Sequence, residues 1–171
     1  SYSSSPLSWP FMARPTSFHY VEVTDGSQGC AVDKCASEVL ALGNPVIWWA
    51  ALLAVPYQLW RWVARRDWRS GAVVAGIAAG WLPWMLYLER TIFTFYTVVY
   101  SSFVAMAVAM TLGALLGPTN ATESRRTRGA VVVSLTLVAV IAVAWWFYPI
   151  WTGQLMPHAE WNLRMWLPTW V

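Results

Sequence analysis

The sequence holds 171 residues, of which 58% are hydrophobic and only 11% are charged. Water-soluble globular domains carry about 25% charged residues, so this composition argues against a soluble protein. The net charge of +3 comes largely from two arginine clusters between long uncharged runs. That placement favours a multispanning membrane protein over a nucleic-acid-binding protein.

Residues 1–43 are polar and proline-containing, and we expect them to form an extracytoplasmic loop region. Residues 17–23 alternate polar and apolar side chains, which predicts a short strand. Asp25-Gly26 is a turn signal, and a second strand near residues 30–32 would complete a two-stranded hairpin. Residues 33–41 are predicted to form a short helix that leads into the membrane.

Cys30 and Cys35 are the only cysteines of the chain. In an extracytoplasmic loop they can join in a disulfide where the local geometry allows it, and two free thiols are the alternative. A metal site is disfavoured, because two thiolates do not complete a tetrahedral ligand set unless His19 is recruited.

Four long apolar stretches are predicted to cross the membrane as helices. They are residues 45–62, 72–88, 92–116 and 130–151. At about 1.5 Å per residue each can cross a hydrocarbon core of about 30 Å, the second only barely. Asn44-Pro45 suits a helix start, Pro56 and Pro83 predict kinks, and Gly76 with Gly80 allows close helix contact.

The arginine clusters lie in residues 61–70 and 119–128, and the positive-inside rule puts both of these loops in the cytoplasm. Both termini are then extracytoplasmic, and the Trp-rich tail is expected to lie along the outer membrane surface. The predicted architecture is therefore an all-α polytopic membrane protein, with a loop region (1–43) followed by a four-helix membrane domain (44–171). Because the chain starts at Ser1 with no signal peptide, we expect it to be part of a longer or processed protein.

Glu89 and Arg90 stand alone between the second and third apolar runs. An arginine at this position can bind a phosphate with its planar fork of donors. Alternatively, the two side chains pair in a tight turn or extend to the membrane surface. Tyr96 and Tyr100 share a helical face, and with Thr97 and Ser101 they either line a path below Arg90 or pack helix against helix. The other polar side chains expected on this outer face are Arg14, His19, Tyr20, Glu22, His158, Glu160 and Arg164.

The sequence contains no nucleotide-binding glycine loop, no paired-histidine metal motif and no serine nucleophile elbow. We therefore expect neither a metal ion nor a cofactor. His19 and His158 are expected to be hydrogen-bonding loop residues rather than catalysts.

Three blocks of sequence follow one another in a specific order: SSPLSWPFMARP (residues 4–15), ALGNPVIWW (41–49) and WLPWMLYLERTIFTFY (81–96). Together they resemble the C-terminal four-span membrane domain of protein O-mannosyltransferases, above all the bacterial, actinobacterial type. YPIWTGQLMP (148–157) and HAEWNLRMWLPTWV (158–171) also resemble the end of those enzymes. Eukaryotic relatives have a histidine pair after the arginine of the third block, where this sequence has residues 94–97, TFYT.

The resemblance implies a multi-pass enzyme of the cell membrane that transfers mannose from polyprenyl-phosphate mannose to Ser or Thr hydroxyls of exported proteins. The implied partners are the lipid bilayer, this lipid-linked donor, the acceptor segments and the N-terminal catalytic half of the same enzyme. The family's acidic catalytic pair lies in an external loop that has no counterpart here. No catalytic residue is therefore assigned to this chain, and the chain alone is expected to be inactive.

In this family setting, Arg90 is the first candidate for holding the lipid phosphate, with Glu89 or Tyr96 orienting it, and Arg14 is the second. The alternative function is a non-catalytic membrane module that packs against a partner, or a piece of a lipid carrier or transporter. Gly76 and Gly80 suit that alternative equally well.

Overall fold

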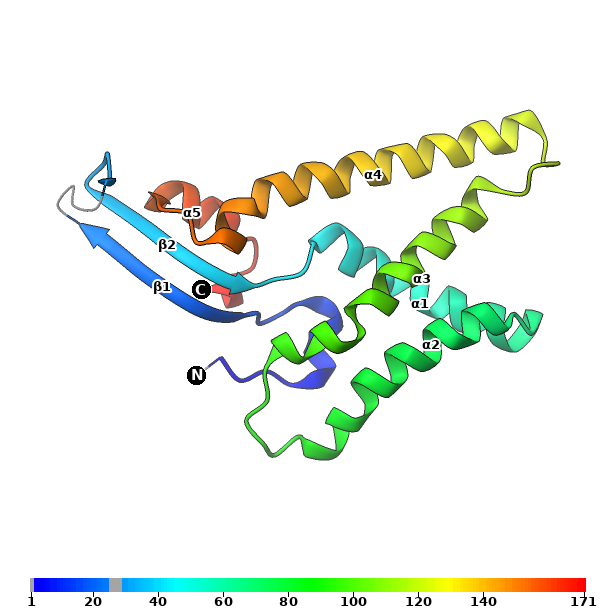
Figure 1. Cartoon of the computed structure of the whole chain (residues 1–171), viewed down its shortest axis with the longest axis horizontal. Coiled ribbons are helices and arrows are strands. Elements are labelled where there is room, and N and C mark those ends of the chain that lie inside the picture. The colour runs from blue at the N-terminus through cyan, green and yellow to red at the C-terminus, as the bar shows by residue number, and fades with distance from the viewer. Residues whose placement is uncertain (1, 25–28) are drawn as a thin grey trace.

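The protein is described from a computed structural model that covers residues 2–24 and 29–171. A small antiparallel sheet and a short helix lie at one end, and long helices extend away from them (Figure 1). Both ends of the described chain lie near the sheet. The α1–α2 and α3–α4 connections lie at the far end of the molecule.

The sheet has the order β1-β2-β3, and both pairings are antiparallel. Its strands are β1 (Thr16–Thr24), β2 (Lys34–Ala41) and the two-residue β3 (Met156–Pro157). The strand predicted for residues 17–23 is present within β1. The predicted turn at Asp25-Gly26 lies outside the described residues. Because the protein contains a three-stranded sheet, it is mostly helical and not all-α as predicted.

The helix predicted for residues 33–41 is wrong, as is the position of the second strand near residues 30–32. Residues 34–41 form β2 instead, in which Ala36, Glu38 and Leu40 are buried at every second position. A period of two suits a strand, and pairing with β1 along its length outweighs the helix propensity of Ala, Glu and Leu. Of the two alternatives that the sequence left open for the cysteines, the disulfide is present, and it joins Cys30 to Cys35 at the start of β2.

Four long helices lie between β2 and β3 in the sequence. They are α1 (Pro45–Arg65), α2 (Trp68–Trp81), α3 (Val98–Leu116) and α4 (Glu123–Thr152). Asn44 caps α1 by accepting a hydrogen bond from the Val46 amide at 3.0 Å, with Pro45 in the first turn as predicted. Pro83 has no amide hydrogen to donate, and the second apolar run accordingly continues beyond α2 as a 3₁₀ helix, η3 (Leu82–Tyr87).

Shorter elements complete the chain. They are the 3₁₀ helices η1 (Pro6–Phe11), η4 (Thr94–Thr97) and η5 (Pro168–Trp170) and the helix α5 (His158–Arg164). The C-terminal tail folds back onto the N-terminal segment, where the Trp170 indole donates a hydrogen bond to the Met12 carbonyl at 2.7 Å. The tail is therefore packed into the sheet end of the molecule.

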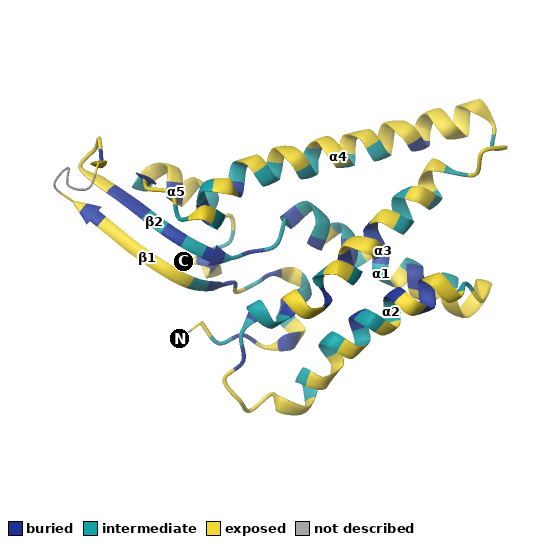
Figure 2. Ribbon diagram, in the orientation of Figure 1, coloured by how far each residue is buried: buried dark blue, intermediate teal, exposed yellow. Residues whose placement is uncertain are grey.

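Three segments of the described chain are long and apolar enough to cross a membrane: Trp68–Tyr87, Thr94–Leu116 and Glu123–Thr152. This agrees with three of the four predicted spans. Helix α1 has 21 residues, but Trp, Pro, Tyr and Gln lower its mean hydropathy. Most of α4 is exposed (Figure 2), although it is the most apolar of the three segments, as expected of a helix whose surroundings are lipid or another membrane segment.

Helices α1, α2 and α3 pack around a buried polar network. The Gln58 side chain, fully buried, donates to the Thr111 hydroxyl at 2.9 Å and accepts from the Ser70 hydroxyl at 2.7 Å. Gly76 lies against the Phe103 ring of α3, so the predicted close approach of helices at this glycine is present. These contacts hold α1, α2 and α3 together.

Candidate functional site

The loop of residues 88–93, here called the tip loop, joins η3 to η4 at the sheet-facing end of the helices. Glu89 and Arg90 are both exposed on it. The Arg90 guanidinium lies 5.8 Å from the centroid of the Tyr87 ring, and the Arg90 amide donates to the Tyr87 carbonyl at 3.0 Å. Within the described chain no ion pair joins Glu89 to Arg90, so the guanidinium edge is available to a ligand.

Thr94 connects the tip loop to the N-terminal segment. Its hydroxyl hydrogen-bonds to the Ser4 hydroxyl at 2.9 Å and donates to the Arg14 carbonyl. The Ser4 amide donates to the Ile92 carbonyl at 2.9 Å, and the Trp9 indole donates to the Ser4 hydroxyl, also at 2.9 Å. Arg14 is exposed, and its backbone is thereby tied to a residue four positions after Arg90.

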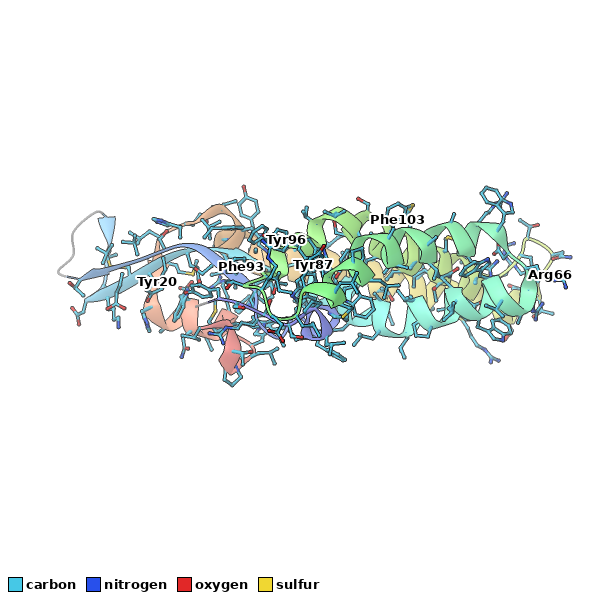
Figure 3. The ribbon with its side chains drawn as sticks, turned by 90° about the horizontal axis from the view of Figure 1, so that it is seen from below. Tyr20, Arg66, Tyr87, Phe93, Tyr96 and Phe103 are labelled. Carbon is cyan, nitrogen blue, oxygen red and sulfur yellow. A yellow bond between two sulfur atoms is a disulfide. The ribbon has the colours of Figure 1, made fainter. Side chains whose placement is uncertain are left out.

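The contact region between the tip loop and the N-terminal segment is here called the junction, and an aromatic cluster packs beneath it. The Trp84 and Tyr96 rings stack with centroids 4.3 Å apart, and Trp9 meets Trp84 edge-on at 6.0 Å. The Trp81 indole donates to the Pro6 carbonyl at 2.9 Å. Figure 3 shows Tyr87, Phe93 and Tyr96 gathered in the middle of the molecule, between the sheet and the long helices. Packing of these rings against one another restricts their side-chain rotamers and holds the residues on both sides of the tip loop in place.

The second sequence block joins the same junction. The Trp49 indole donates to the Phe11 carbonyl at 3.3 Å, which attaches the start of α1 to the end of η1. The Trp48 ring contacts the Tyr100 ring edge-on at 6.0 Å. All three blocks therefore meet in space, although they are far apart in the sequence.

The polar residues at the start of α3 pack rather than line a polar path. Tyr100 is buried beside an apolar cavity of about 180 Å³ that Trp48 and Trp81 also line. The Ser101 hydroxyl donates to the Val98 carbonyl of its own helix at 2.9 Å. Of the two interpretations offered by the sequence, helix packing is the one that matches this geometry.

Glu38, which the sequence did not single out, is a buried carboxylate on the sheet. Its side chain accepts a hydrogen bond from the Trp161 indole of α5 at 2.7 Å. Tyr20 and His158 both contact the Trp161 ring, with centroid separations of 5.4 and 5.0 Å. The alternation of β2 is the signal that would have placed Glu38 inward, and the prediction of a helix there concealed it.

Tyr20 and Glu22 form a polar pair on β1. The Tyr20 hydroxyl donates to the Glu22 carboxylate at 3.2 Å, and Lys34 forms an ion pair with Glu22 at 3.1 Å. The hydrogen bond from Lys34 lowers the pKa of Glu22, whereas partial burial and then the bond to Glu22 raise the pKa of Tyr20. The Glu22 carboxylate is therefore occupied by Tyr20 of its own strand and by Lys34 of β2.

The remaining residues expected on the outer face are dispersed. Arg164 donates to the Trp146 carbonyl at 3.0 Å, lies over the Trp146 ring at 4.6 Å and forms an ion pair with Glu160 at 3.6 Å. His19 is exposed on β1. These contacts attach α5 to α4 and leave Arg90 and Arg14 as the exposed cations of the junction.

The junction is suited to binding an anion at the surface of an apolar region. The Arg90 guanidinium lies over the Tyr87 ring, and a guanidinium binds phosphate oxygens with its planar fork of donors. Among residues 2–24 and 29–171, no group of three or more His, Cys, Asp or Glu side chains is placed to hold a metal ion.

Comparison with known proteins gives a consistent result. The family model described as the C-terminal four-transmembrane region of protein O-mannosyltransferase matches residues 1–170. A polyprenol-phosphate-mannose–protein mannosyltransferase of Mycolicibacterium smegmatis is 38% identical over 99% of this chain and 32% of its own length. The enzyme with the same name from Mycobacterium tuberculosis is 34% identical, with the same coverage. The chain thus spans about a third of the length of the curated relatives that it matches.

The fold also has a counterpart among solved structures. In the S. cerevisiae protein O-mannosyltransferase Pmt1–Pmt2 complex bound to the sugar donor, the match covers 99% of this chain and 24% of the solved chain. The TM-score is 0.73 at 22% sequence identity, a likeness that concerns the fold alone.

Proposed function

The chain belongs to the family of C-terminal four-transmembrane regions of protein O-mannosyltransferases, and from this we propose that it is the C-terminal part of a membrane mannosyltransferase. The proposed enzyme transfers mannose from polyprenyl-phosphate mannose to Ser or Thr hydroxyls of exported proteins. The proposal is carried by the match over residues 1–170, and the names of the relatives supply the donor. The acceptor is inferred from the protein mannosyltransferase activity in the same names.

We propose that α1 is the fourth membrane span. Its 21 residues give a helix of roughly 30 Å, which is the thickness of the hydrocarbon core. Its packing against α2 and α3 in a common core supports this assignment. The arginines clustered around the α1–α2 connection and at the start of α4 then face the cytoplasm. The sheet, the tip loop and both ends of the described chain are extracytoplasmic in this arrangement.

In this arrangement Arg90 binds the phosphate of the lipid-linked donor at the outer membrane surface. Its exposure, and the lack of an ion pair to Glu89 in the described chain, leave the donor fork of the guanidinium free for phosphate oxygens. The stack of Tyr96 on Trp84 supports the loop from below. Arg14 is the second candidate cation, because its backbone carbonyl is attached to Thr94, four positions after Arg90.

The proposed chemistry needs such a cation. The hydroxyl oxygen of the acceptor forms a bond to the anomeric carbon of mannose, and the bond from that carbon to the phosphate oxygen breaks. The hydroxyl proton passes to a carboxylate in the N-terminal part of the enzyme, and the lipid phosphate leaves with an added negative charge. Arg90 stabilises this charge, so it favours the transition state as well as donor binding.

Steady-state kinetics of the full-length enzyme test this role. Arg90→Gln is expected to lower kcat/KM for the lipid donor by about tenfold or more, since a charge-assisted hydrogen bond contributes roughly 1.5–3 kcal/mol. The KM for the acceptor peptide should stay near the wild-type value. Glu89→Gln is the matched control in the same loop and should keep most of the donor efficiency; equal donor kinetics for wild type and Arg90→Gln would reject the role of Arg90.

A further inference from the structure

A second concave surface lies at the far end of the molecule, between the α1–α2 and α3–α4 connections. This basic cavity encloses about 1100 Å³. The side chains that matter for its chemistry are Arg61, Arg65, Arg69, Arg125, Trp60 and Trp68. In Figure 3, Arg66 marks this end of the molecule, opposite the end marked by Tyr20.

The cavity carries an excess of positive charge. Its single acidic lining residue, Asp67, forms an ion pair with Arg61 at 2.6 Å. In the described chain no carboxylate pairs with Arg65, Arg69 or Arg125, so three guanidinium groups remain uncompensated there. Glu123, the other acidic residue at this end, lies on a different surface of α4 beside Arg126.

Aromatic rings hold two of these arginines at the rim. The Arg65 guanidinium lies 5.3 Å from the Trp60 ring centroid, and that of Arg69 lies 5.8 Å from the Trp68 ring centroid. Trp68 is 72% exposed. An exposed indole at the end of an apolar helix is typical of the boundary between lipid headgroups and acyl chains.

The opposite wall leaves room for a bulky polar group. It consists of the end of α3, where Gly113, Ala114 and Gly117 present almost no side chain to the cavity. A methyl group added at Gly113 would meet no atom within 4 Å. Gly117 has a φ of 83°, a backbone conformation that favours glycine, and it turns the chain towards α4 and Arg125.

We propose that the basic cavity binds the phosphodiester headgroup of an anionic membrane phospholipid, whose acyl chains run along the apolar surfaces of α1 and α3. Guanidinium groups match phosphate oxygens in pairs, and the exposed tryptophans fix the depth of the site at the membrane surface. Basic pockets between membrane helices on the cytoplasmic side are suited to such headgroups. This site goes beyond the proposed mannosyltransferase function, because it lies at the opposite end from the tip loop and needs neither mannose nor an acceptor.

Native mass spectrometry of the purified full-length enzyme tests the proposal, with phosphatidylglycerol and phosphatidylcholine of identical acyl chains as probes. The cavity variant carries Arg65→Gln, Arg69→Gln and Arg125→Gln, and it keeps Arg61 because of its ion pair. The matched control carries Arg66→Gln, Arg126→Gln and Arg128→Gln. It removes the same total charge, one arginine from the α1–α2 connection and two from the start of α4, and none of its residues lines the basic cavity.

The wild type is expected to bind its first phosphatidylglycerol about tenfold more tightly than phosphatidylcholine, in line with the attraction of juxtamembrane arginines to anionic lipid. The cavity variant should lose this preference, whereas the control variant should keep it within about twofold. The single variant Arg125→Glu should also lose most of the preference for phosphatidylglycerol. It keeps the proposal testable if the triple variant fails to fold. Millimolar inorganic phosphate should not displace the lipid.

Three results would overturn the proposal. An equal loss of the preference for phosphatidylglycerol in the cavity and control variants would mean diffuse electrostatic attraction without a binding site. Absence of any headgroup preference in the wild type would exclude an anionic lipid. Displacement by inorganic phosphate would mean that the cavity recognises a soluble anion. Donor kinetics of Arg90→Gln are measured separately, so failure of this proposal leaves the proposed function unaffected.

Discussion

Replacing Thr94 by valine tests whether the tip loop is fastened to the N-terminal segment as the structure has it. Valine has nearly the shape of threonine, so the substitution removes the hydroxyl and little else. Thr94 is 4% exposed, and its hydroxyl contacts both the Ser4 hydroxyl and the Arg14 carbonyl. Each lost hydrogen bond costs about 0.5–1.5 kcal/mol, and a buried group left without a partner costs about 1–3 kcal/mol. We therefore expect Thr94→Val to lower the free energy of unfolding by about 2–4 kcal/mol.

The assay is reversible unfolding of the full-length enzyme in mixed micelles with increasing denaturing detergent, followed by tryptophan fluorescence. Thr94→Ser keeps the hydroxyl and should recover most of the lost stability. Thr136→Val is the control for the same chemical change, because the Thr136 hydroxyl bonds only to the Val132 carbonyl of its own exposed helix. If Thr94→Val unfolds within about 0.5 kcal/mol of the wild type, the contacts of Thr94 do not hold the junction together.

Three further changes test the helix packing and the charged turn. Gln58→Ala leaves a buried cavity and removes the hydrogen bond to Ser70. It should therefore lower the free energy of unfolding by about 2–4 kcal/mol in the same assay. Gly76→Ala brings a methyl group within 2.5 Å of the Phe103 ring and should cost about 1–3 kcal/mol. Burial raises the pKa of Asp67, but hydrogen bonds led by that from Ser70 outweigh it and leave the pKa below its usual value of 3.8. The charged carboxylate therefore stabilises the fold above this value and ceases to do so as the pH falls below about 4, so Asp67→Asn should be less stable at pH 7 and lose less stability between pH 7 and 3.

These predictions have internal controls. Gly113→Ala, in α3, meets no atom within 4 Å of the added methyl group, so it should leave stability unchanged or raise it by up to about 1 kcal/mol through helix propensity. If Gly113→Ala lost as much stability as Gly76→Ala, contact with the neighbouring helix would not be the cause of the loss at Gly76. Wild-type stability for Gln58→Ala would contradict the buried network, and identical acid unfolding of wild type and Asp67→Asn would contradict the low pKa of Asp67.

Much of the helical part was predictable, because membrane spans are specified by local composition. Three of the four expected spans recur in the structure as apolar segments of spanning length, and Asn44-Pro45 begins α1 as its chemistry indicates. The wrong prediction for residues 33–41 has a physical cause. Ala36, Glu38 and Leu40 have helix propensity, and only pairing with β1, a contact between distant residues, makes them a strand.

The sequence marked candidate residues for the site, but it could not predict how they are arranged. Isolation between apolar runs was enough to mark Glu89 and Arg90. The bonds from Ser4 to Ile92 and from Thr94 to Arg14 join segments about 80 to 90 positions apart, and no local pattern predicts them. The buried partnership of Glu38 with Trp161 likewise depends on the tail folding back over the sheet.

The most direct test of the central claim is the equilibrium affinity of the purified full-length enzyme for polyprenyl phosphate, which has the phosphate and lipid of the donor but no mannose. If Arg90 holds the phosphate, Arg90→Gln should raise the Kd by roughly ten- to a hundredfold, as expected for loss of a charged hydrogen bond of about 1.5–3 kcal/mol. Arg66→Gln, which removes the same charge at the far end of the molecule, should leave the Kd within about twofold of wild type. The same Kd for wild type and a correctly folded Arg90→Gln protein would contradict the claim that Arg90 binds the donor phosphate.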